Sequence, residues 1–332
     1  MKNFMKSNFG LILLSLLFLL SGLRLSYAQQ SVKCLAVITE INGEALIKEV
    51  GMSAFNKASW GNQLFQGDQI ATSDKSEVKL LFSNNSLIVL GPNSMITISG
   101  KETPLTQPLG NVKTISSAAI INLSALTSAR EEKKDVGALA GVRSVTFSQA
   151  IELTTPYNTL IKTERPSFSW QTKQPFDKFT VNLYNSKGLV WSKKVSELSM
   201  KYPESEKGLE LGESYFWNVE GEYLIDTDKS ANHKFTVLTL EKLKETADNE
   251  SIIKDTFKDN PESSSLHSVL GAYYIDQGLL QDAITEFQVI AKINADAALP
   301  HEMLGSLYSE VGEKDKAIEE LKKALMLTDK DN

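Results

Sequence analysis

The chain has 332 residues, with 35 Lys or Arg against 41 Asp or Glu, and a formal net charge of −6. This length allows two or three domains. The acidic balance argues against nucleic acid as a partner, because no basic surface is available to displace counterions from phosphates. The single cysteine, Cys34, excludes an internal disulfide.

The N-terminus has the pattern of a cleavable export signal. Lys2 and Lys6 precede an apolar run from Leu11 to Leu20, and Ser26-Tyr27-Ala28 follows it. A basic start, an apolar run and a small-x-small site are typical of a secretory signal peptide. The run is shorter than the about 20 apolar residues that a membrane span needs. We therefore expect a signal peptide over residues 1–28, cleavage after Ala28, a periplasmic or secreted location, and no stable membrane insertion afterwards.

Residues 32–100 have the pattern of an all-β domain. The Asn42-Gly43 pair lies between two short apolar runs and predicts a β-hairpin. A polar turn at Asn84-Asn85 joins two further runs in the same way. The expected strands are Leu35–Ile38, Glu44–Lys48, Glu77–Phe82 and Ser86–Leu90.

The order of motifs in this segment resembles a known family. Trp60 is followed by the Gly67-Asp68 turn, by Ile70-Ala71-Thr72, and later by Leu90-Gly91-Pro92-Asn93-Ser94. This order is similar to the periplasmic FecR domain, although Asn85 stands where that family often has Gly. In iron-uptake signalling, FecR proteins join this domain to a cytoplasmic anti-sigma segment and a membrane helix. Residues 1–28 are too short for such a segment, so the resemblance implies a FecR-like module reused in an exported protein.

Residues 101–149 have little regular pattern. Pro104 and Pro108 predict a loop, Ala118–Ala129 is apolar enough for a helix, and Arg130–Asp135 is a run of charges. A charge run of this kind is usually a solvated segment. We expect a linker with a possible helix.

Residues 150–238 predict a second β domain. Phe179–Tyr184 and Tyr215–Val219 alternate with the period of two that a half-buried strand has. Several short strands separated by turns predict an immunoglobulin- or fibronectin-like sandwich. Trp170 and Trp217 are expected in its core. Exposed aromatic rings on a carbohydrate-binding face remain an alternative.

Residues 239–332 contain a repeat with an offset of 34 residues. Leu270-Gly271 recurs as Leu304-Gly305, Tyr274 as Tyr308, and Ala283 as Ala317. This pattern resembles tetratricopeptide (TPR) repeats, which are helical hairpins that stack into protein-binding surfaces. Full repeats are expected over 264–297 and 298–331, with a partial helical repeat before them. From Thr239 onward the chain has 19 acidic and 10 basic residues.

The TPR resemblance also predicts a binding groove. The first helix of each hairpin would line its concave side, which predicts the candidate residues Ser268, Ala272, Ile275, Glu302, Ser306 and Ser309. These positions lack the Lys, Arg and Asn side chains with which some TPR domains grip a C-terminal carboxylate. A helix or an apolar segment is the expected ligand of the groove.

Catalytic and metal-binding patterns are weak. His267 and His301 are 34 residues apart, at the position where TPR motifs usually carry Trp, so packing explains them better than a shared metal ion. We expect no enzyme activity, no cofactor and no metal.

The preferred function is an exported scaffold or assembly factor that binds a cell-envelope protein. The alternative is a sensory component whose FecR-like domain receives a signal from an outer-membrane partner. The composition change near Leu238 further predicts that the β half folds without the helices.

Overall fold

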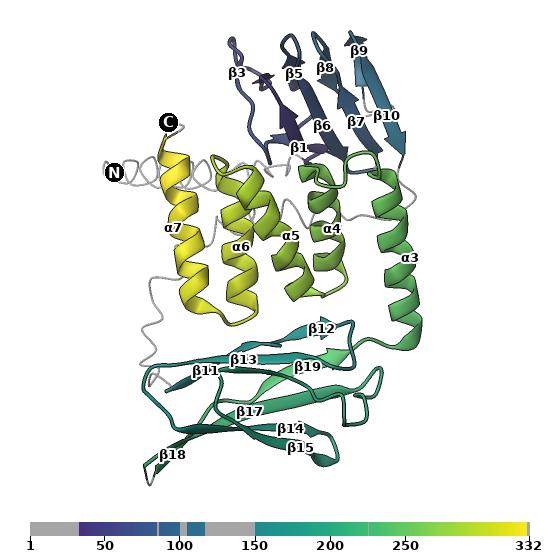
Figure 1. The fold of residues 1–332 in the computed structure, drawn as a ribbon. Coiled ribbons are helices and arrows are strands. Elements are labelled where there is room, and N and C mark those ends of the chain that lie inside the picture. The colour runs from purple at the N-terminus through teal and green to yellow at the C-terminus, as the bar shows by residue number, and fades with distance from the viewer. Residues whose placement is uncertain (1–32, 85, 100–104, 117–149, 225, 331–332) are drawn as a thin grey trace, which may run out of the picture. The chain divides into compact units, whose positions relative to one another are not determined.

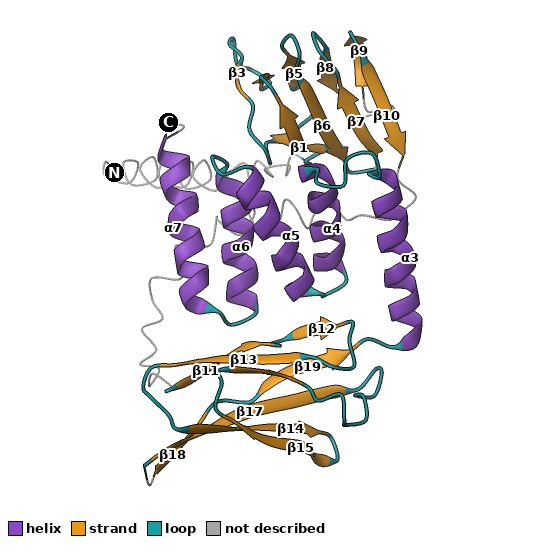
Figure 2. Ribbon diagram, viewed as in Figure 1, coloured by secondary structure: helices purple, strands orange, loops and turns teal. Residues whose placement is uncertain are grey.

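A computed structural model describes residues 33–84, 86–99, 105–116, 150–224 and 226–330. Within these ranges the protein is multidomain, with several β-sheets followed by five C-terminal helices that are consistent with TPR-like hairpins (Figures 1 and 2). The expected signal peptide and the possible helix at Ala118–Ala129 lie outside the described residues.

The first β domain consists of two five-stranded sheets around a shared core. One sheet has the order β10 (Val112–Ser116), β7 (Ser86–Leu90), β6 (Glu77–Phe82), β1 (Ala36–Asn42) and β4 (Gln63–Leu64). The other has the order β3 (Asn56–Lys57), β2 (Ala45–Lys48), β5 (Gln69–Thr72), β8 (Met95–Ile98) and β9 (Leu105–Leu109). Ile38 and Leu80 from the first sheet meet Ile70 and Ile96 from the second in one buried cluster.

The predicted hairpin at Asn42-Gly43 is wrong, although both expected strands exist. Strand β1 pairs with β4 and β6, whereas β2 pairs with β3 and β5 in the other sheet. Gly43 has a φ of 87°, and the following amide, from Glu44, donates to Ser76 Oγ at 2.9 Å. The Asn-Gly turn therefore forms a corner between two sheets. By contrast, β6 and β7 pair as the predicted antiparallel neighbours.

The segment expected as a linker begins later than predicted. Strands β9 and β10 lie within it and pair with β8 and β7 respectively. Pro108 falls within β9, which is the edge strand of its sheet. A proline is tolerated there because an edge strand leaves one row of backbone N–H groups unpaired.

The second β domain is a sandwich, as predicted. A three-stranded sheet has the order β11 (Ile151–Thr155), β13 (Ser167–Thr172) and β16 (Ser199–Lys201). A six-stranded sheet has the order β12 (Thr159–Ile161), β19 (His233–Val237), β17 (Ser214–Tyr223), β14 (Lys178–Asn185) and β15 (Gly188–Val195), with β18 (Asp226–Lys229) paired to β17. Trp170 and Trp217 are buried in the core between the sheets. Trp217 Nε1 donates to the Pro156 carbonyl at 2.7 Å, so neither ring is available to stack on a sugar.

The helices form two hairpins preceded by one helix. They are α3 (Leu240–Thr256), α4 (Ser264–Asp276), α5 (Leu280–Ile293), α6 (Ala298–Glu310) and α7 (Lys314–Lys330). Ser263 caps α4 by accepting a hydrogen bond from the Leu266 amide at 3.1 Å. Gly271 on α4 lies against the Phe287 ring of α5, so the absence of a side chain lets these helices approach closely. The Tyr274 hydroxyl donates to Glu250 at 2.9 Å, which joins α4 to α3.

Candidate functional site

The six predicted groove residues do not form one open groove. On α4, Ser268 and Ala272 are fully buried and Ile275 is partly buried. On α6, Glu302 is buried while Ser306 and Ser309 are exposed. Ala272 therefore does not face solvent, and only the second hairpin keeps an exposed part of the expected groove.

The first β domain contributes to the burial around α4. The outer face of its first sheet places Val37, Leu81 and Leu87 in the same apolar cluster as the helices, together with Trp60. Gly61, next to Trp60, lies directly against the Leu299 side chain of α6. Apolar side chains of the first β domain and of both hairpins therefore belong to one continuous core.

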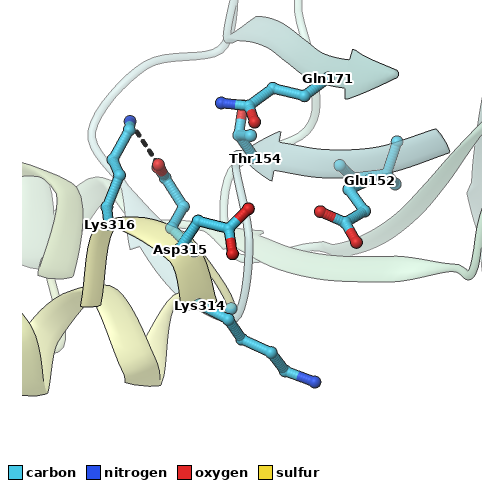
Figure 3. Close-up of a pocket in the computed structure, with 9 residues that line it drawn as sticks. Glu152, Thr154, Gln171, Lys314, Asp315 and Lys316 are labelled. Atoms are coloured by element: carbon cyan, nitrogen blue, oxygen red, sulfur yellow. Dashed lines mark ion pairs between the residues drawn. The ribbon is translucent and has the colours of Figure 1, made fainter. Parts of the chain in front are cut away.

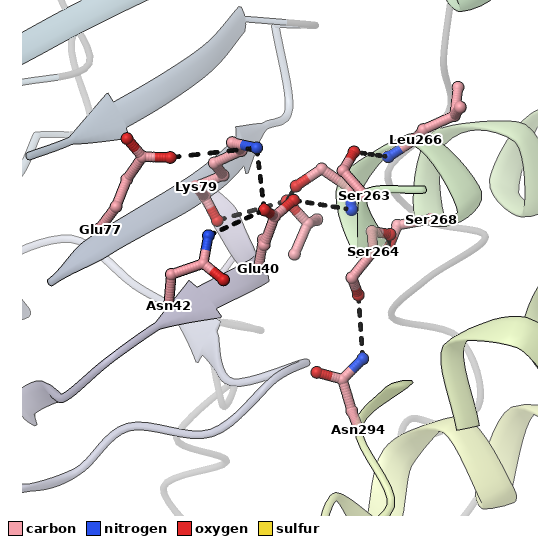
Figure 4. Close-up of polar contacts among 11 residues, drawn as sticks. Glu40, Asn42, Glu77, Lys79, Ser263, Ser264, Leu266, Ser268 and Asn294 are labelled. Atoms are coloured by element: carbon pink, nitrogen blue, oxygen red, sulfur yellow. Dashed lines mark hydrogen bonds and ion pairs between the residues drawn. The ribbon is translucent and has the colours of Figure 1, made fainter. Parts of the chain in front are cut away.

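Polar contacts at the start of α4 reinforce this junction (Figure 4). The Thr39 and Ser265 hydroxyls are 2.8 Å apart and both side chains are fully buried. Glu40 accepts a hydrogen bond from Lys79 Nζ at 2.9 Å, and its second oxygen lies 3.4 Å from the Ser265 amide nitrogen. The Asn42 amide donates to the same carboxylate at 3.1 Å. A carboxylate at a helix N-terminus is stabilised by the exposed N–H groups and the helix dipole.

A second charged junction connects the sandwich to the helices. Lys162, just after β12, lies 2.8 Å from Glu250 on α3 and 2.7 Å from Asp282 on α5. Its ammonium is also 4.5 Å from the centroid of the Tyr274 ring. Burial opposes the charge of Lys162, but the hydrogen bonds that its ammonium donates to Asp282 and Glu250 outweigh this effect and raise the lysine pKa. Burial, together with the Glu250 charge, also raises the pKa of Tyr274.

Two hollows accompany the contacts between the sandwich and the helices. One, of about 360 Å³, is lined by Lys162, by Pro156 and Ser167 of the sandwich, and by Asp282 and Thr285 of α5. Because the Lys162 ammonium is already paired with the carboxylates of Glu250 and Asp282, it is not available to bind an anionic ligand in this hollow.

The other hollow lies where the sandwich meets the start of α7 (Figure 3). Glu152, Thr154 and Gln171 line it from the sandwich, and Asp315 and Lys316 line it from α7. Its volume of about 30 Å³ has room for a single water molecule, so it is too small for an organic ligand.

The two repeat histidines are each paired with a glutamate of the following helix. His267 Nδ1 lies 2.6 Å from Glu286, and His301 Nδ1 lies 2.5 Å from Glu320. The pairs recur at the 34-residue offset, so the repeat accounts for the spacing that suggested a metal site. Within the described ranges, His, Cys, Asp and Glu side chains do not gather into a group that could hold a metal ion.

Sequence reasoning missed the contact between the first sheet and α4. A sequence pattern that indicates such a contact is present in Leu35-Ala36-Val37-Ile38, where every residue is apolar and none alternates with a polar one. Such a run is expected where both faces of a strand are buried. In β1 the inward Ala36 and Ile38 fill the sheet core, while Val37 packs towards the helices. What the run could not indicate was which element would cover the second face.

Comparisons with known proteins leave the family open. No protein-family model matches the chain, and no curated protein matches it. The resemblance to FecR domains therefore remains an interpretation of the sequence. Among the described residues, no helix combines the length and apolar character needed to cross a membrane.

Several solved structures share local features with this chain. A cell surface anchoring domain is 18% identical with a TM-score of 0.19, over 20% of this chain and 87% of that one. MamA MSR-1 C2 is 18% identical with a TM-score of 0.24, over 27% of this chain and 52% of that one. The fn3 domain of human collagen alpha-1(XX) chain is 14% identical with a TM-score of 0.22, over 29% and 93%.

Proposed function

We propose that this chain is an exported, non-catalytic scaffold of the cell envelope that binds a protein partner through its second helical hairpin. The FecR-like domain and the sandwich serve mainly to hold the helical region in place. The export step rests on the N-terminal sequence pattern. The absence of catalytic chemistry rests on the lack of any nucleophile or phosphate-loop motif in the sequence.

The observation that supports this proposal best is the unequal exposure of the two hairpins. The α4 surface is used inside the molecule, through contacts with Thr39 and Glu40. The equivalent α6 surface keeps Ser306, Ser309 and Glu310 exposed. Small side chains beside an acidic one leave room for a partner's side chains, and an apolar helix with basic residues would fit this surface.

The sensory alternative has one structural point in its favour. Thr39 and Glu40 join strand β1 directly to the start of α4. A ligand that displaced β1 would remove these contacts and alter the first hairpin. The sensory alternative predicts that the partner binds the first β domain, whereas the scaffold proposal predicts that it binds α6.

The test is a pair of substitutions on α6. A partner is first identified by crosslinking in intact cells, and its affinity is then measured for Ser306→Arg with Ser309→Arg. We expect the affinity to fall at least about tenfold, as for central interface contacts, with an unchanged melting temperature because both sites are exposed. Ser251→Arg, at an exposed position on α3, is the matched control. Unchanged affinity in the double variant would remove α6 as the binding surface.

A further inference from the structure

The hollow of about 360 Å³ between the sandwich and α5 has the size of a ligand-binding pocket. Such pockets begin at about 300 Å³. Pro156, Ile161 and Pro166 line it and are themselves buried, so they give it an apolar lining. Ser167 on β13 and Thr285 on α5 also line it and are exposed, so a ligand can enter from solvent. A molecule in this hollow would contact the sandwich and the first helical hairpin together.

Three polar side chains of this hollow have no hydrogen-bond partner within the described ranges. They are Thr155 and Ser167 of the sandwich and Gln281 of α5. A hydroxyl group and a side-chain amide can each donate and accept a hydrogen bond. Because these three side chains line one hollow, they can bond to the same ligand.

The charges that line the hollow cancel. Lys162 and Asp282 are the two ionised side chains in its lining, and they form an ion pair at 2.7 Å. An anionic ligand would have to separate Lys162 from Asp282, and so would a cationic ligand. Breaking a partly buried pair leaves one of its charges without a partner, which is unfavourable. The hollow therefore favours a ligand without net charge.

An extended peptide would find no sheet edge to pair with at this hollow. Peptides of this kind add a strand to an exposed edge through main-chain hydrogen bonds. Strand β12, which reaches the hollow through Ile161, is an edge strand, but its Leu160 amide already donates to the Gly278 carbonyl at 3.0 Å. Strand β13 lies between β11 and β16 and has no free edge. Recognition at this site therefore rests on side chains.

We propose that this hollow binds a neutral sugar ring. Sugar hydroxyls donate and accept hydrogen bonds, and so do the side chains of Thr155, Ser167 and Gln281. The C–H groups of the ring can pack against Pro156 and Pro166. The ring belongs either to a free sugar or to the end of a glycan chain. The site does not involve the buried tryptophans of the sandwich core.

This site goes beyond the function proposed above and does not depend on it. The partner surface lies on α6 at Ser306 and Ser309, whereas the hollow is lined by the sandwich and α5. Sugar binding is measured on the purified protein without the protein partner, so either proposal can fail without the other.

The first test is saturation-transfer NMR of the purified protein with glucose, galactose, mannose and N-acetylglucosamine at millimolar concentration. At least one of these sugars should receive magnetisation from the protein. Acetate and methylammonium are the charged control probes and should receive none. No transfer to any of the sugars, or equal transfer to a charged probe, would overturn the proposal.

The second test places the sugar in the hollow. Ser167→Ala with Gln281→Ala removes two hydrogen-bonding groups and should weaken sugar binding at least about tenfold. Thr285→Trp should abolish binding, because a large side chain at this exposed position fills the hollow. Ser251→Ala with Gln171→Ala makes the same exchanges at exposed positions outside the hollow and should leave binding unchanged. Unchanged binding in either hollow variant would overturn the proposal.

The third measurement distinguishes the two sources of the ring. The dissociation constant of the sugar that binds is compared with that of a soluble oligosaccharide ending in the same sugar. Equal or tighter binding of the oligosaccharide, lost in Thr285→Trp, would identify the end of a glycan chain as the ligand. Binding of the monosaccharide alone would identify a free sugar.

Discussion

At the scale of single residues, Glu40 and Glu77 both pair with Lys79 but differ in how deeply they are buried. Lys79 lies 2.9 Å from Glu40 and 4.0 Å from Glu77. The Glu40 side chain is 8% exposed and also lies at the start of α4, whereas that of Glu77 is 42% exposed. An exposed pair is weakened by water and salt, whereas a buried one is strengthened by its surroundings.

We predict that Glu40→Ala lowers the free energy of unfolding by about 2 kcal/mol, because it leaves Lys79 and the Ser265 amide without a buried acceptor. Glu77→Ala is the control and should change it by less than about 0.5 kcal/mol. Denaturant unfolding of both variants checks this. Equal effects of the two substitutions would show that the Glu40 contact with α4 contributes nothing.

The second residue-scale prediction concerns pH. Burial lowers the pKa of His233 from 6.5 to about 4. Its ring packs against that of Tyr157 in a tilted arrangement, with centroids 4.0 Å apart, and Nδ1 is buried without a hydrogen-bond partner among the described residues. As pH falls below 6.5 the unfolded chain binds a proton before the folded one does. Stability should therefore be full above pH 6.5 and fall towards pH 4, by about 2 kcal/mol for a partly exposed ring.

His233→Phe supplies the comparison for this pH dependence. The phenyl ring keeps the contact with Tyr157 and cannot take up a proton. Melting curves between pH 4 and 7 should show a smaller decrease for the variant than for the unchanged protein. Parallel pH profiles for the two proteins would mean that other groups account for the acid sensitivity.

At the scale of helices, the two repeat glycines are not equivalent. A Cβ at Gly271 would lie 2.9 Å from the ring of Phe287, which is fully buried and cannot move aside. A Cβ at Gly305 would lie 2.6 Å from Leu321, whose side chain is half-exposed and can turn outwards. The same motif therefore has a stricter steric requirement in the first hairpin.

We predict that Gly271→Ala costs about 1–3 kcal/mol through overpacking. Gly305→Ala should cost less than about 1 kcal/mol, because the higher helix propensity of Ala offsets the smaller clash. Thermal unfolding of the two variants measures the difference. A larger cost at Gly305 would indicate that the Leu321 side chain is held in place and cannot turn outwards.

Individual helices and strands differ in how well the sequence predicted them. The 34-residue offset predicted both hairpins, since Gly271 and Phe287 are a local steric pair. Strands β6 and β7 followed from alternation and an Asn-rich turn. The corner at Gly43 could not be predicted, because Asn-Gly permits the backbone geometry of a hairpin without deciding which strands pair. Strand β9 was missed because Pro108 is a loop signal except at a sheet edge.

At the scale of the whole molecule, the β and helical parts are not independent. Cys34–Asn332 form one compact unit, and Val37, Leu81 and Leu87 share a core with the helices. The composition change near Leu238 lies next to Thr239, the N-cap residue of α3. It gave no information about packing across that boundary, because net charge describes solvated surfaces and not apolar contacts.

Removing Thr239–Asn332 should therefore destabilise the first β domain, contrary to the expectation from the sequence. Val37, Trp60, Leu81 and Leu87 would become exposed, and each fully buried side chain of this kind contributes about 1.5–3 kcal/mol. The shortened chain should bind a hydrophobic dye and unfold at lower denaturant concentration than the full chain. An unchanged midpoint without dye binding would mean that the shared core contributes little.

The central claim is that the second hairpin is where this protein meets its partner. The most direct measurement places a photo-crosslinking amino acid at Ser306, at Lys113 on β10 of the first β domain, or at Leu189 on the sandwich, all exposed positions. Illumination of intact cells should give a covalent adduct of defined mass from Ser306 and none from the other two sites. An adduct from Lys113 with none from Ser306 would contradict the scaffold proposal and support the sensory alternative.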